Sequence, residues 1–369
     1  MGATLALRIT AVYRVAGDAA SIEARAQGIA LEQSIEAPLA AVRDDYVRRE
    51  IVGEVGAIRE IAAGRFEVEI GLSAATVGDD AGQLLNMLYG NSSLQADVEL
   101  ADFHLPEEVI ARFPGPGRGI AGLRARAGAP ARALTCVAVK PQGLPPAGLA
   151  VLTEALALGG VDFIKDDHGF ADQAYAPFAA RVAANAAACR RAADRTGRLA
   201  CYVPVLSGHY GRMRDQIALA REHGLAAVMI APMIAGLSTA QALAEENRDL
   251  IVFAHPTMGG AARIAPPALM RLFRLVGGDV GIFPNYGGRF GYSKATCLAL
   301  AEGLRAQWGG LKDAMPTPAG GMTTARVGEM LDAYGADTML LIGGALLSAP
   351  PERLVEESAA FVAAVGEHR

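Results

Sequence analysis

The sequence predicts an α/β protein with a C-terminal (β/α)8 barrel of the TIM type and an N-terminal α+β domain of the ferredoxin-like kind. From about residue 133 onward one pattern recurs eight times: a short apolar or β-branched run, a turn with Gly or Pro, and a longer amphipathic segment. Eight such units in about 240 residues fit a closed barrel better than an open, doubly wound sheet. Before about residue 125, alternating polar and apolar residues predict an antiparallel sheet instead.

The N-terminal domain is assigned to residues 1–125 and the barrel domain to residues 126–369. The first domain is expected to contain strands at 5–14 and 66–72 and helices at 18–30 and 80–88. The stretch Pro114–Gly119 holds two prolines and three glycines in six residues, so it can form neither a helix nor a strand. We therefore place the linker at that stretch.

The barrel domain is expected to alternate strands and helices along its whole length. The strands are expected at 133–139, 161–165, 199–205, 225–231, 250–254, 280–284, 312–317 and 337–342. The helices are expected at 147–158, 174–195, 212–223, 238–247, 266–276, 294–308, 324–333 and 352–365. Each helix is long enough to cross back over a parallel sheet, as such a connection requires.

Residues Gly117–Gly122 match the dinucleotide-binding pattern G-x-G-x-x-G. That pattern works when a strand feeds the first glycine and an acidic residue follows about 20 positions later. Here a Pro-Gly-Pro segment precedes the glycines and no such acidic residue follows. We therefore do not expect a nucleotide cofactor at this loop.

Composition excludes several functional classes. The chain has 34 basic and 39 acidic residues, a net charge of -5, and no basic cluster that could follow a phosphate backbone, so no nucleic acid is expected as a partner. No apolar run reaches the roughly 18 residues of a membrane helix, and Arg8 and Arg14 interrupt the start of the chain, so we expect a cytoplasmic protein without a membrane partner. The spacing of the four cysteines fits neither a zinc site nor a disulfide framework, so buried, reduced thiols are expected.

Polar residues and glycines follow the expected strands at the ends where barrel enzymes build their sites. They are Lys140, Lys165–His168, His209, His255, Arg289, Gly320, Gly321, Gly343 and Gly344. Taken singly, a charge cluster is often a solvated loop, a histidine is often a core residue, and a glycine pair is usually a turn. All of them are expected at the same face of the barrel, which favours a functional site there. The two glycine pairs after the last two strands match the usual phosphate site of such barrels.

At these residues the chain resembles the RuBisCO superfamily, and the likeness covers both domains. Val139–Leu144 is similar to the family's first-strand Lys-Pro segment, and Gly159–His168 is similar to its metal-binding segment. The resemblance implies that Lys165 is carbamylated by CO₂ and that the carbamate, Asp167 and His168 bind Mg²⁺. A carbamate supplies the hard anionic oxygen that Mg²⁺ prefers, whereas an ammonium cannot bind a cation. Because His168 replaces an acid of the family, Mn²⁺ or another transition metal is also possible.

Further segments resemble the family in the same order and at similar spacing. They are Ser207–Tyr210 with His209, His255, Gly277–Asp279, Ala319–Gly321 and Gly343–Gly344. Glu32 and Asn91 match residues that the family contributes to the active site of the partner subunit. The resemblance therefore implies a homodimer with shared active sites, in which these two residues contact the substrate bound by the other subunit.

Three departures from the family pattern lead us to expect no carboxylation. A carboxylase has a lysine on the loop after the sixth strand, where this chain has Arg289. The family's arginine after the strand-five histidine, which binds a second phosphate, is Pro256 here, and the serine before the strand-seven glycines is Ala319. One phosphate-binding end is therefore lost, and the pattern is that of a RuBisCO-like protein without CO₂ fixation.

The site residues that the chain shares with the family predict enolisation chemistry on a phosphorylated ketose. Lys140, Lys165 and His255 are the expected catalytic residues, and a lysine or the carbamate close to the metal suits a general base. Among the reactions that the resemblance implies, we favour the 1,3-proton-transfer isomerisation of 5-methylthioribulose 1-phosphate in sulfur (methionine) salvage, because a thioether suits the apolar residues expected near the site. Those residues are Met233, Pro256, Met258 and Phe283.

Three alternatives stay open at this point: an enolase acting on a diketo methylthiopentyl phosphate, a decarboxylase of a branched sugar-acid phosphate, and a non-catalytic sugar-phosphate binder. A binder needs the glycine pairs but has no use for two lysines and a metal site, which makes it the weakest of the three.

Overall fold

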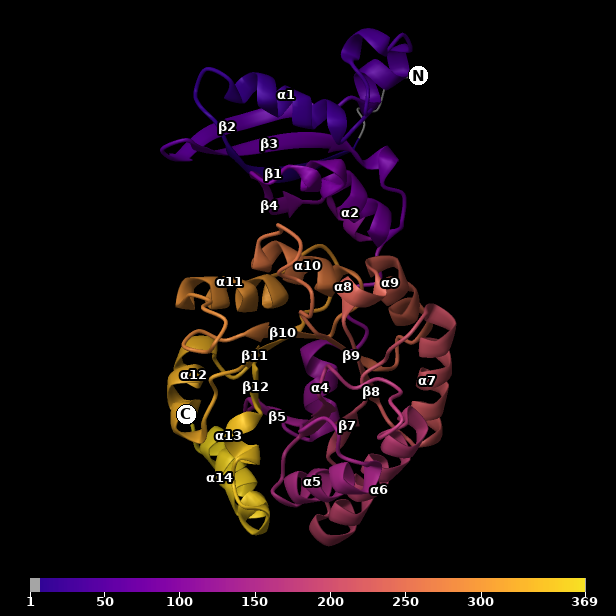
Figure 1. Ribbon diagram of the computed structural model, residues 1–369, viewed down its shortest axis with the longest axis vertical. Coiled ribbons are helices and arrows are strands. Elements are labelled where there is room, and N and C mark those ends of the chain that lie inside the picture. The colour runs from indigo at the N-terminus through magenta and orange to yellow at the C-terminus, as the bar shows by residue number, and fades with distance from the viewer. Residues whose placement is uncertain (1–6, 369) are drawn as a thin grey trace.

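The computed structural model describes residues 7–368. A four-stranded antiparallel sheet with its helices lies at one end of the molecule, and a parallel barrel surrounded by helices forms the rest (Figure 1). This arrangement confirms the predicted fold class. The domain boundary near residue 125 stays a prediction.

The N-terminal sheet has the strand order β2-β3-β1-β4. Its strands are β1 (Arg8–Ala16), β2 (Glu54–Ala62), β3 (Arg65–Ser73) and β4 (Val98–His104). Its helices are α1 (Ile22–Glu32) and α2 (Ala81–Tyr89). Alternate residues of β1 and β3 are buried, as the sequence pattern predicts for a sheet covered on one face. Residues 5 and 6 of the first expected strand lie outside the described residues.

The strands β2 and β4 are not predicted by the sequence. In β2 the apolar residues Val55, Ile58 and Ile61 are spaced by three, which imitates a helix more than a strand. The spacing arises because the pairing of β2 with β3 shifts register twice, between Val55 and Ile58 and again between Glu60 and Ala62. Bulges of this kind hide a strand from any analysis that looks for strict alternation.

The barrel sheet has the order β7-β6-β5-β12-β11-β10-β9-β8. Its strands are β5 (Leu134–Val139), β6 (Phe163–Asp166), β7 (Cys201–Val203), β8 (Ala227–Ile230), β9 (Ile251–Ala254), β10 (Val280–Pro284), β11 (Met315–Ala319) and β12 (Met339–Ile342). A bridge between Val205 and Met229 joins β7 to β8, so the eight strands close on themselves. All eight expected strands are confirmed within a few residues at each end.

The helices of the barrel part also follow the prediction closely. The long ones are α5 (Pro146–Leu158), α6 (Phe178–Thr196), α7 (Tyr210–Glu222), α9 (Leu237–Glu246), α10 (Pro266–Leu275), α11 (Lys294–Arg305), α12 (Val327–Tyr334) and α14 (Leu354–Glu367). The sequence did not predict α3 (Glu107–Ile110), α4 (Gly119–Ala127), α8 (Pro232–Ala235) or α13 (Gly344–Leu347). Single turns of other helix types lie at Leu39–Ala41, Val47–Ile51, Ala74–Thr76, Asn91–Leu94, Thr324–Arg326 and Pro351–Arg353.

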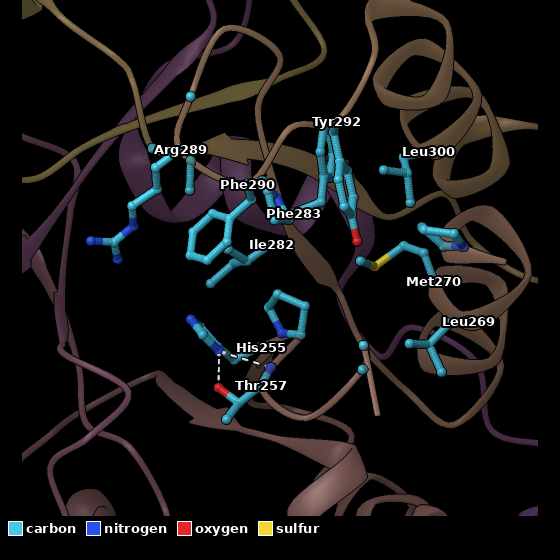
Figure 2. A pocket seen from close by; sticks show the side chains of 18 of the residues that line it. His255, Thr257, Leu269, Met270, Ile282, Phe283, Arg289, Phe290, Tyr292 and Leu300 are labelled. Carbon is cyan, nitrogen blue, oxygen red and sulfur yellow. Dashed lines mark hydrogen bonds between the residues drawn. The ribbon is translucent and has the colours of Figure 1, made fainter. Parts of the chain in front are cut away.

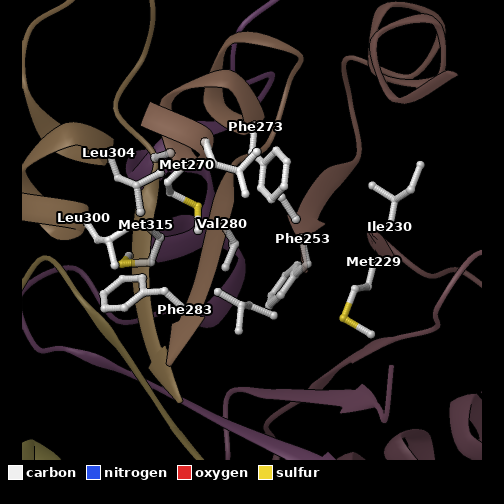
Figure 3. Packing of buried hydrophobic residues seen from close by; sticks show 14 of the residues in the cluster. Met229, Ile230, Phe253, Met270, Phe273, Val280, Phe283, Leu300, Leu304 and Met315 are labelled. Atoms are coloured by element: carbon white, nitrogen blue, oxygen red, sulfur yellow. The ribbon is translucent and has the colours of Figure 1, made fainter. Parts of the chain in front are cut away.

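The core fills the barrel and the layer between its strands and helices. Figure 3 shows this packing around β10, where Met270 and Phe273 of α10 and Leu300 and Leu304 of α11 surround the strand. A Cβ atom on Gly281 would come within 2.6 Å of Leu304 and 2.7 Å of Met270. The glycine is therefore needed for both helices to pack directly against the middle of β10.

The glycine-rich stretch at 117–122 begins α4 rather than a cofactor loop. The backbone N–H groups of Arg118 and Gly119 donate to the carboxylate of Asp279, at 2.6 and 2.7 Å. The same carboxylate accepts from the N–H of Val252 at 2.8 Å. The amide groups that a dinucleotide phosphate needs are thus occupied by a side chain of the protein itself.

A main-chain pairing connects the two parts of the molecule. Leu100 of β4 forms a bridge with Ile264, on the segment that leads from β9 to α10. The N–H of Leu100 donates to Arg263 at 2.9 Å, and the N–H of Ala265 donates to Leu100 at 2.8 Å. The segment that leaves the barrel after β9 thus extends the N-terminal sheet at its β4 edge.

All four cysteines are free and buried, as expected for reduced thiols. Between residues 7 and 368, the structure contains no helix with the length and apolar character needed to span a bilayer.

Candidate active site

A cavity of about 1400 Å³ lies at the carboxyl ends of the barrel strands and reaches the edge of the N-terminal sheet. The predicted site residues that line it are Lys140, Lys165, Asp167, His168, His255, Arg289, Gly320, Gly321, Gly343 and Gly344. They come from the ends of six different strands, so barrel closure brings them together. The residues Pro256, Met258 and Phe283, expected to make the site apolar, also line the cavity.

Lys165 lies near the carboxyl end of β6 and is 2% exposed. Its Nζ atom donates a hydrogen bond of 2.7 Å to the main-chain oxygen of Asp166. Burial lowers the pKa of this amine, because the charged form loses its hydration. A lysine with a lowered pKa is more often neutral, and a neutral amine is the form that reacts with CO₂.

Asp167 is held in its charged form by the groups around it. Lys140 lies 2.9 Å from its Oδ2 atom, and the N–H of Gly169 donates to its Oδ1 atom at 3.1 Å. Burial acts to raise the pKa of Asp167, but the hydrogen bonds from Lys140 and Gly169 outweigh it and lower the pKa to about 2. The carboxylate is therefore available as an anionic ligand at neutral pH.

The two histidines of the site stack on each other. The rings of His168 and His255 lie 4.5 Å apart at an angle of 11°. Nδ1 of His255 is 2.5 Å from the hydroxyl of Thr257, a contact drawn in Figure 2. Burial and the nearby Lys165 lower the pKa of His255 to about 2, and burial also lowers the pKa of His168. Both imidazoles are thus neutral and can offer a lone pair.

Asp166, the remaining acid of the 165–168 segment, points into the protein. It forms a fully buried ion pair with Arg181 at 3.0 Å and accepts from the hydroxyl of Tyr202 at 2.5 Å. Arg181 also donates to the main-chain oxygens of Ala171 and Ala176, at 2.9 and 2.7 Å, on the loop that follows His168. This pair therefore fixes both the end of β6 and the loop beyond it.

Asp166→Asn is expected to destabilise the protein by about 3–5 kcal/mol, because it leaves the buried Arg181 guanidinium without a counter-charge. The matched control is Glu154→Gln, which breaks a partly exposed pair with Arg191 and should cost no more than about 1 kcal/mol. Denaturant unfolding of both variants beside the wild type measures the difference. Equal losses of unfolding free energy in the two variants would show that the buried ion pair stabilises the fold no more than the exposed one.

The two glycine pairs have no side chains, so their main-chain atoms border the cavity directly on one side. Gly320 and Gly321 have positive φ values of 83° and 66°. A Cβ atom on Gly321 would approach the Cα atom of Gly288 to 2.8 Å, so no larger residue fits there. Nothing lies within 4 Å of a Cβ built on Gly343 or Gly344, which leaves open space above that turn.

The loop that carries Arg289 is anchored to the same glycine turn. The N–H of Asn285 donates to Ala319 at 2.8 Å, and Nη1 of Arg326 donates to Gly321 at 2.9 Å. Arg326 also lies over the ring of Tyr286 at 5.5 Å. Sequence reasoning missed Arg326 and Thr257 because neither belongs to a motif, although Thr257 follows His255 by two residues and Arg326 follows Gly321 by five.

Four predicted residues lie away from this cavity. His209 is exposed, and its Nδ1 atom accepts from the N–H of Arg212 at 3.4 Å at the start of α7. Glu32 and Asn91 line a separate cavity of about 480 Å³ in the N-terminal domain, where their side chains are hydrogen-bonded at 2.8 Å. The expectation that Met233 borders the site was wrong. It belongs to α8, beyond the end of β8, and packs against the core.

A metal ion at Asp167 and His168 needs a ligand that an unmodified chain does not supply. Within residues 7–368, no three His, Cys, Asp or Glu side chains are grouped so that they could hold a metal. Lys165, two residues before Asp167, is buried in the same cavity with a lowered pKa. The donor set therefore fits a metal once the lysine carries an anionic oxygen.

Residues 119–281 match the family model of the ribulose bisphosphate carboxylase large chain, catalytic domain. The chain is 57% identical over 360 residues to a 5-methylthioribulose-1-phosphate isomerase of Rhodospirillum rubrum, covering 97% of this chain and 96% of the relative. It is 54% identical to ribulose bisphosphate carboxylase-like protein 1 of Rhodopseudomonas palustris, over 98% of both chains. A crystal structure of a Rubisco-like protein from Rhodopseudomonas palustris superposes with a TM-score of 0.92 at 50% identity, covering 98% of each chain.

Proposed function

This chain belongs to the RuBisCO-like proteins, and on that premise we propose that it is an isomerase that transfers a proton within a ketose monophosphate, with 5-methylthioribulose 1-phosphate as substrate. The observation that carries the proposal is the meeting of Lys140, Lys165, Asp167, His168 and His255 in one cavity beside two bare glycine turns. A 1,3-proton transfer needs a base near the carbon beside the ketone and a site that stabilises negative charge on the carbonyl oxygen. A cavity with these groups can provide both.

The metal site of the proposal consists of Lys165 as its carbamate, Asp167 and His168. Bound there, Mg²⁺ supplies Lewis-acid polarisation of the ketone carbonyl. Lys140, paired with Asp167, and the carbamate are the two candidates for the proton-transferring base, and the neutral His255 ring accepts or orients a proton beside them. Because His168 supplies nitrogen in place of a carboxylate oxygen, Mn²⁺ is the second metal to test.

The glycine turns and Arg289 are proposed to hold the substrate phosphate and its neighbouring oxygens. The backbone of Gly320, Gly321, Gly343 and Gly344 offers N–H donors without side chains in the way. At the other end of the substrate, Pro256 stands where the family has a phosphate-binding arginine. A monophosphate with an apolar end therefore suits the cavity better than a bisphosphate.

The active enzyme is proposed to be a homodimer with shared sites. Glu32 and Asn91 line a cavity near α1, which lies at the end of the N-terminal domain far from the barrel (Figure 1). From there they do not border the barrel cavity of their own chain. A second copy of the chain is the partner whose active site they can complete.

The experiment compares two substrates in D₂O with Mg²⁺ and bicarbonate. Phosphorus NMR should show methylthioribulose phosphate converted to an isomeric monophosphate. Ribulose bisphosphate with labelled CO₂ should give no acid-stable label, because the planar fork of Arg289 does not reproduce the point charge of the carboxylase lysine. Loss of a charge-assisted anchor worth about 1.5–3 kcal/mol should also weaken bisphosphate binding by roughly 10- to 100-fold.

Three results would contradict the proposal. An acid-stable labelled product from the bisphosphate would show that the protein is a carboxylase. Tighter binding of the bisphosphate than of the monophosphate would show that the site still binds a second phosphate. Absence of both turnover and solvent deuterium in every ketose phosphate tested would favour a non-catalytic binder.

A further inference from the structure

The loops that follow β10 and β11 pack main chain against main chain beside the cavity. They meet at two glycine pairs that line it, namely Gly287 and Gly288 after β10 and Gly320 and Gly321 after β11. A Cβ atom on Gly288 would come within 3.1 Å of the main-chain oxygens of Asn285 and Gly320. No side chain fits between the two loops, so a side chain that orients them has to act from outside the cavity.

Arg326 contacts both loops in this way. It precedes α12 and is not among the residues that line the cavity. Its Nη1 atom donates to the main-chain oxygen of Gly321 at 2.9 Å, and the main-chain oxygen of Tyr286 lies 3.4 Å from Nη2 and 3.5 Å from Nη1. A Cβ atom on Gly287 would lie 3.3 Å from both Nη atoms. One planar guanidinium therefore connects the loop after β10 to the loop after β11.

The guanidinium of Arg326 is itself oriented by Glu329. Nε donates to one carboxylate oxygen at 2.9 Å and Nη2 donates to the other at 3.1 Å. Together with the main-chain bonds, these contacts engage all three nitrogen atoms of the guanidinium. Arg326 is therefore a positioning residue, which acts on a bound anion through the main chain of the two loops.

The peptide groups that Arg326 contacts have a defined direction. Both are trans, so the N–H of the following residue points opposite to the carbonyl oxygen. Since the carbonyls of Gly321 and Tyr286 face Arg326, the N–H groups of Met322 and Gly287 point away from it. Both residues line the cavity, and between residues 7 and 368 neither N–H donates to another group of the protein. Two free, oriented amides of this kind suit an anion.

We propose that Arg326 positions the substrate phosphate by keeping the carbonyl oxygens of Gly321 and Tyr286 directed away from the cavity, so that the amides of Met322 and Gly287 face the phosphate. The proposal rests on the proposed function, in which the phosphate binds at the glycine turns. Glycine leaves a peptide group free to rotate, so these turns need a fixed partner to keep one orientation. Arg326 provides that partner for both loops at once.

The test removes the guanidinium and measures the binding of inorganic phosphate by calorimetry. Arg326→Gln removes the fork. Arg353→Gln is the matched control, because Arg353 also ends a short turn before a helix and pairs with a glutamate three residues later, Glu356. Among the described residues, the Arg353 side chain donates to no main-chain oxygen. A second control, Glu329→Gln, breaks the ion pair but keeps the guanidinium.

Arg326→Gln should raise the Kd for inorganic phosphate about tenfold, since the loss of one hydrogen bond to a charged group costs about that much. KM for methylthioribulose phosphate should rise by a similar factor while kcat stays within about threefold of the wild type, because the phosphate is bound equally before and during proton transfer. Arg353→Gln and Glu329→Gln should leave the phosphate Kd within about twofold, because exposed ion pairs contribute little.

Arg326→Lys should give a smaller rise in the phosphate Kd, about threefold, because an ammonium can bond one of the two carbonyls but cannot span both as a planar fork does. Circular dichroism confirms that each variant is folded. If Arg326→Gln does not fold, Arg326→Lys decides the question by the same measurement.

An unchanged phosphate Kd in the folded Arg326 variants would overturn the positioning role. An equal rise in Glu329→Gln would also overturn it, because the ion pair and not the main-chain contacts would then be responsible. A wild-type protein that binds no phosphate would overturn it as well. A wild type that binds phosphate but turns over no ketose phosphate would instead overturn the proposed function, and the phosphate Kd of the variants would still decide the role of Arg326.

Discussion

Lys165→Met is expected to lower kcat/KM by a factor on the order of a thousand or more and to leave the fold intact. The variant removes the amine that would carry the carbamate. The proposed site thereby loses one metal ligand and one candidate base, and the loss of a single catalytic group of this kind lowers the rate about 10²- to 10³-fold. The chain stays folded because an unbranched apolar side chain of similar size replaces a buried amine that burial already disfavours in its charged form.

Two readouts besides activity check this result. Carbon NMR after exposure to labelled CO₂ should show a carbamate in the wild type and none in the variant, and calorimetry should show weaker Mg²⁺ binding. The control is Lys312→Ala, which removes a lysine whose Nζ atom donates to Gly117, far from the strand ends that form the cavity. Turnover by Lys165→Met close to that of the wild type would refute the assigned role.

Mixing two inactive variants, Glu32→Gln and Lys165→Met, is expected to restore about a quarter of the wild-type activity. Random pairing makes half of the dimers mixed, and each mixed dimer has one site with an intact barrel and an intact partner residue. Each variant alone should stay inactive, because every site in it lacks one of the two groups.

A matched mixture supplies the control for this experiment. Glu32→Gln mixed with Asn91→Ala should restore activity only weakly, because both changes lie in the N-terminal domain and every site of a mixed dimer lacks one of the two residues. Mass spectrometry under native conditions verifies that mixed dimers have formed. Verified mixed dimers of Glu32→Gln and Lys165→Met without activity would mean that each subunit builds its site alone.

The barrel could be predicted from the sequence because its strands are buried on both faces. Runs such as Met339–Ile342 are apolar throughout, and a turn and an amphipathic helix follow each of them. The N-terminal sheet was predicted less completely. The strand β2 is mostly exposed and bulged, so neither burial nor alternation marks it in the sequence.

The candidate site residues that directly follow a strand could be predicted from the sequence. Closure of the barrel brings the carboxyl ends of its strands together, and this does not depend on the details of the loops. Lys165, Asp167, His168 and His255 meet for that reason. The part of the cavity lining that comes from α10 and α11, namely Leu269, Met270 and Leu300, could not be predicted in this way. Both helices pack directly on β10 because Gly281 has no side chain, and that packing is known only once the fold is known.

The pairing of Leu100 with Ile264 ties the loop beside His255 to the N-terminal sheet. Any displacement of that loop must either break two main-chain hydrogen bonds or carry β4 with it. In a dimer with shared sites, Glu32 and Asn91, which would serve the neighbouring subunit, belong to the same N-terminal domain as β4. We therefore expect a displacement of this loop in one site to shift the residues that serve the other site, so that the two sites of such a dimer respond to each other's substrate.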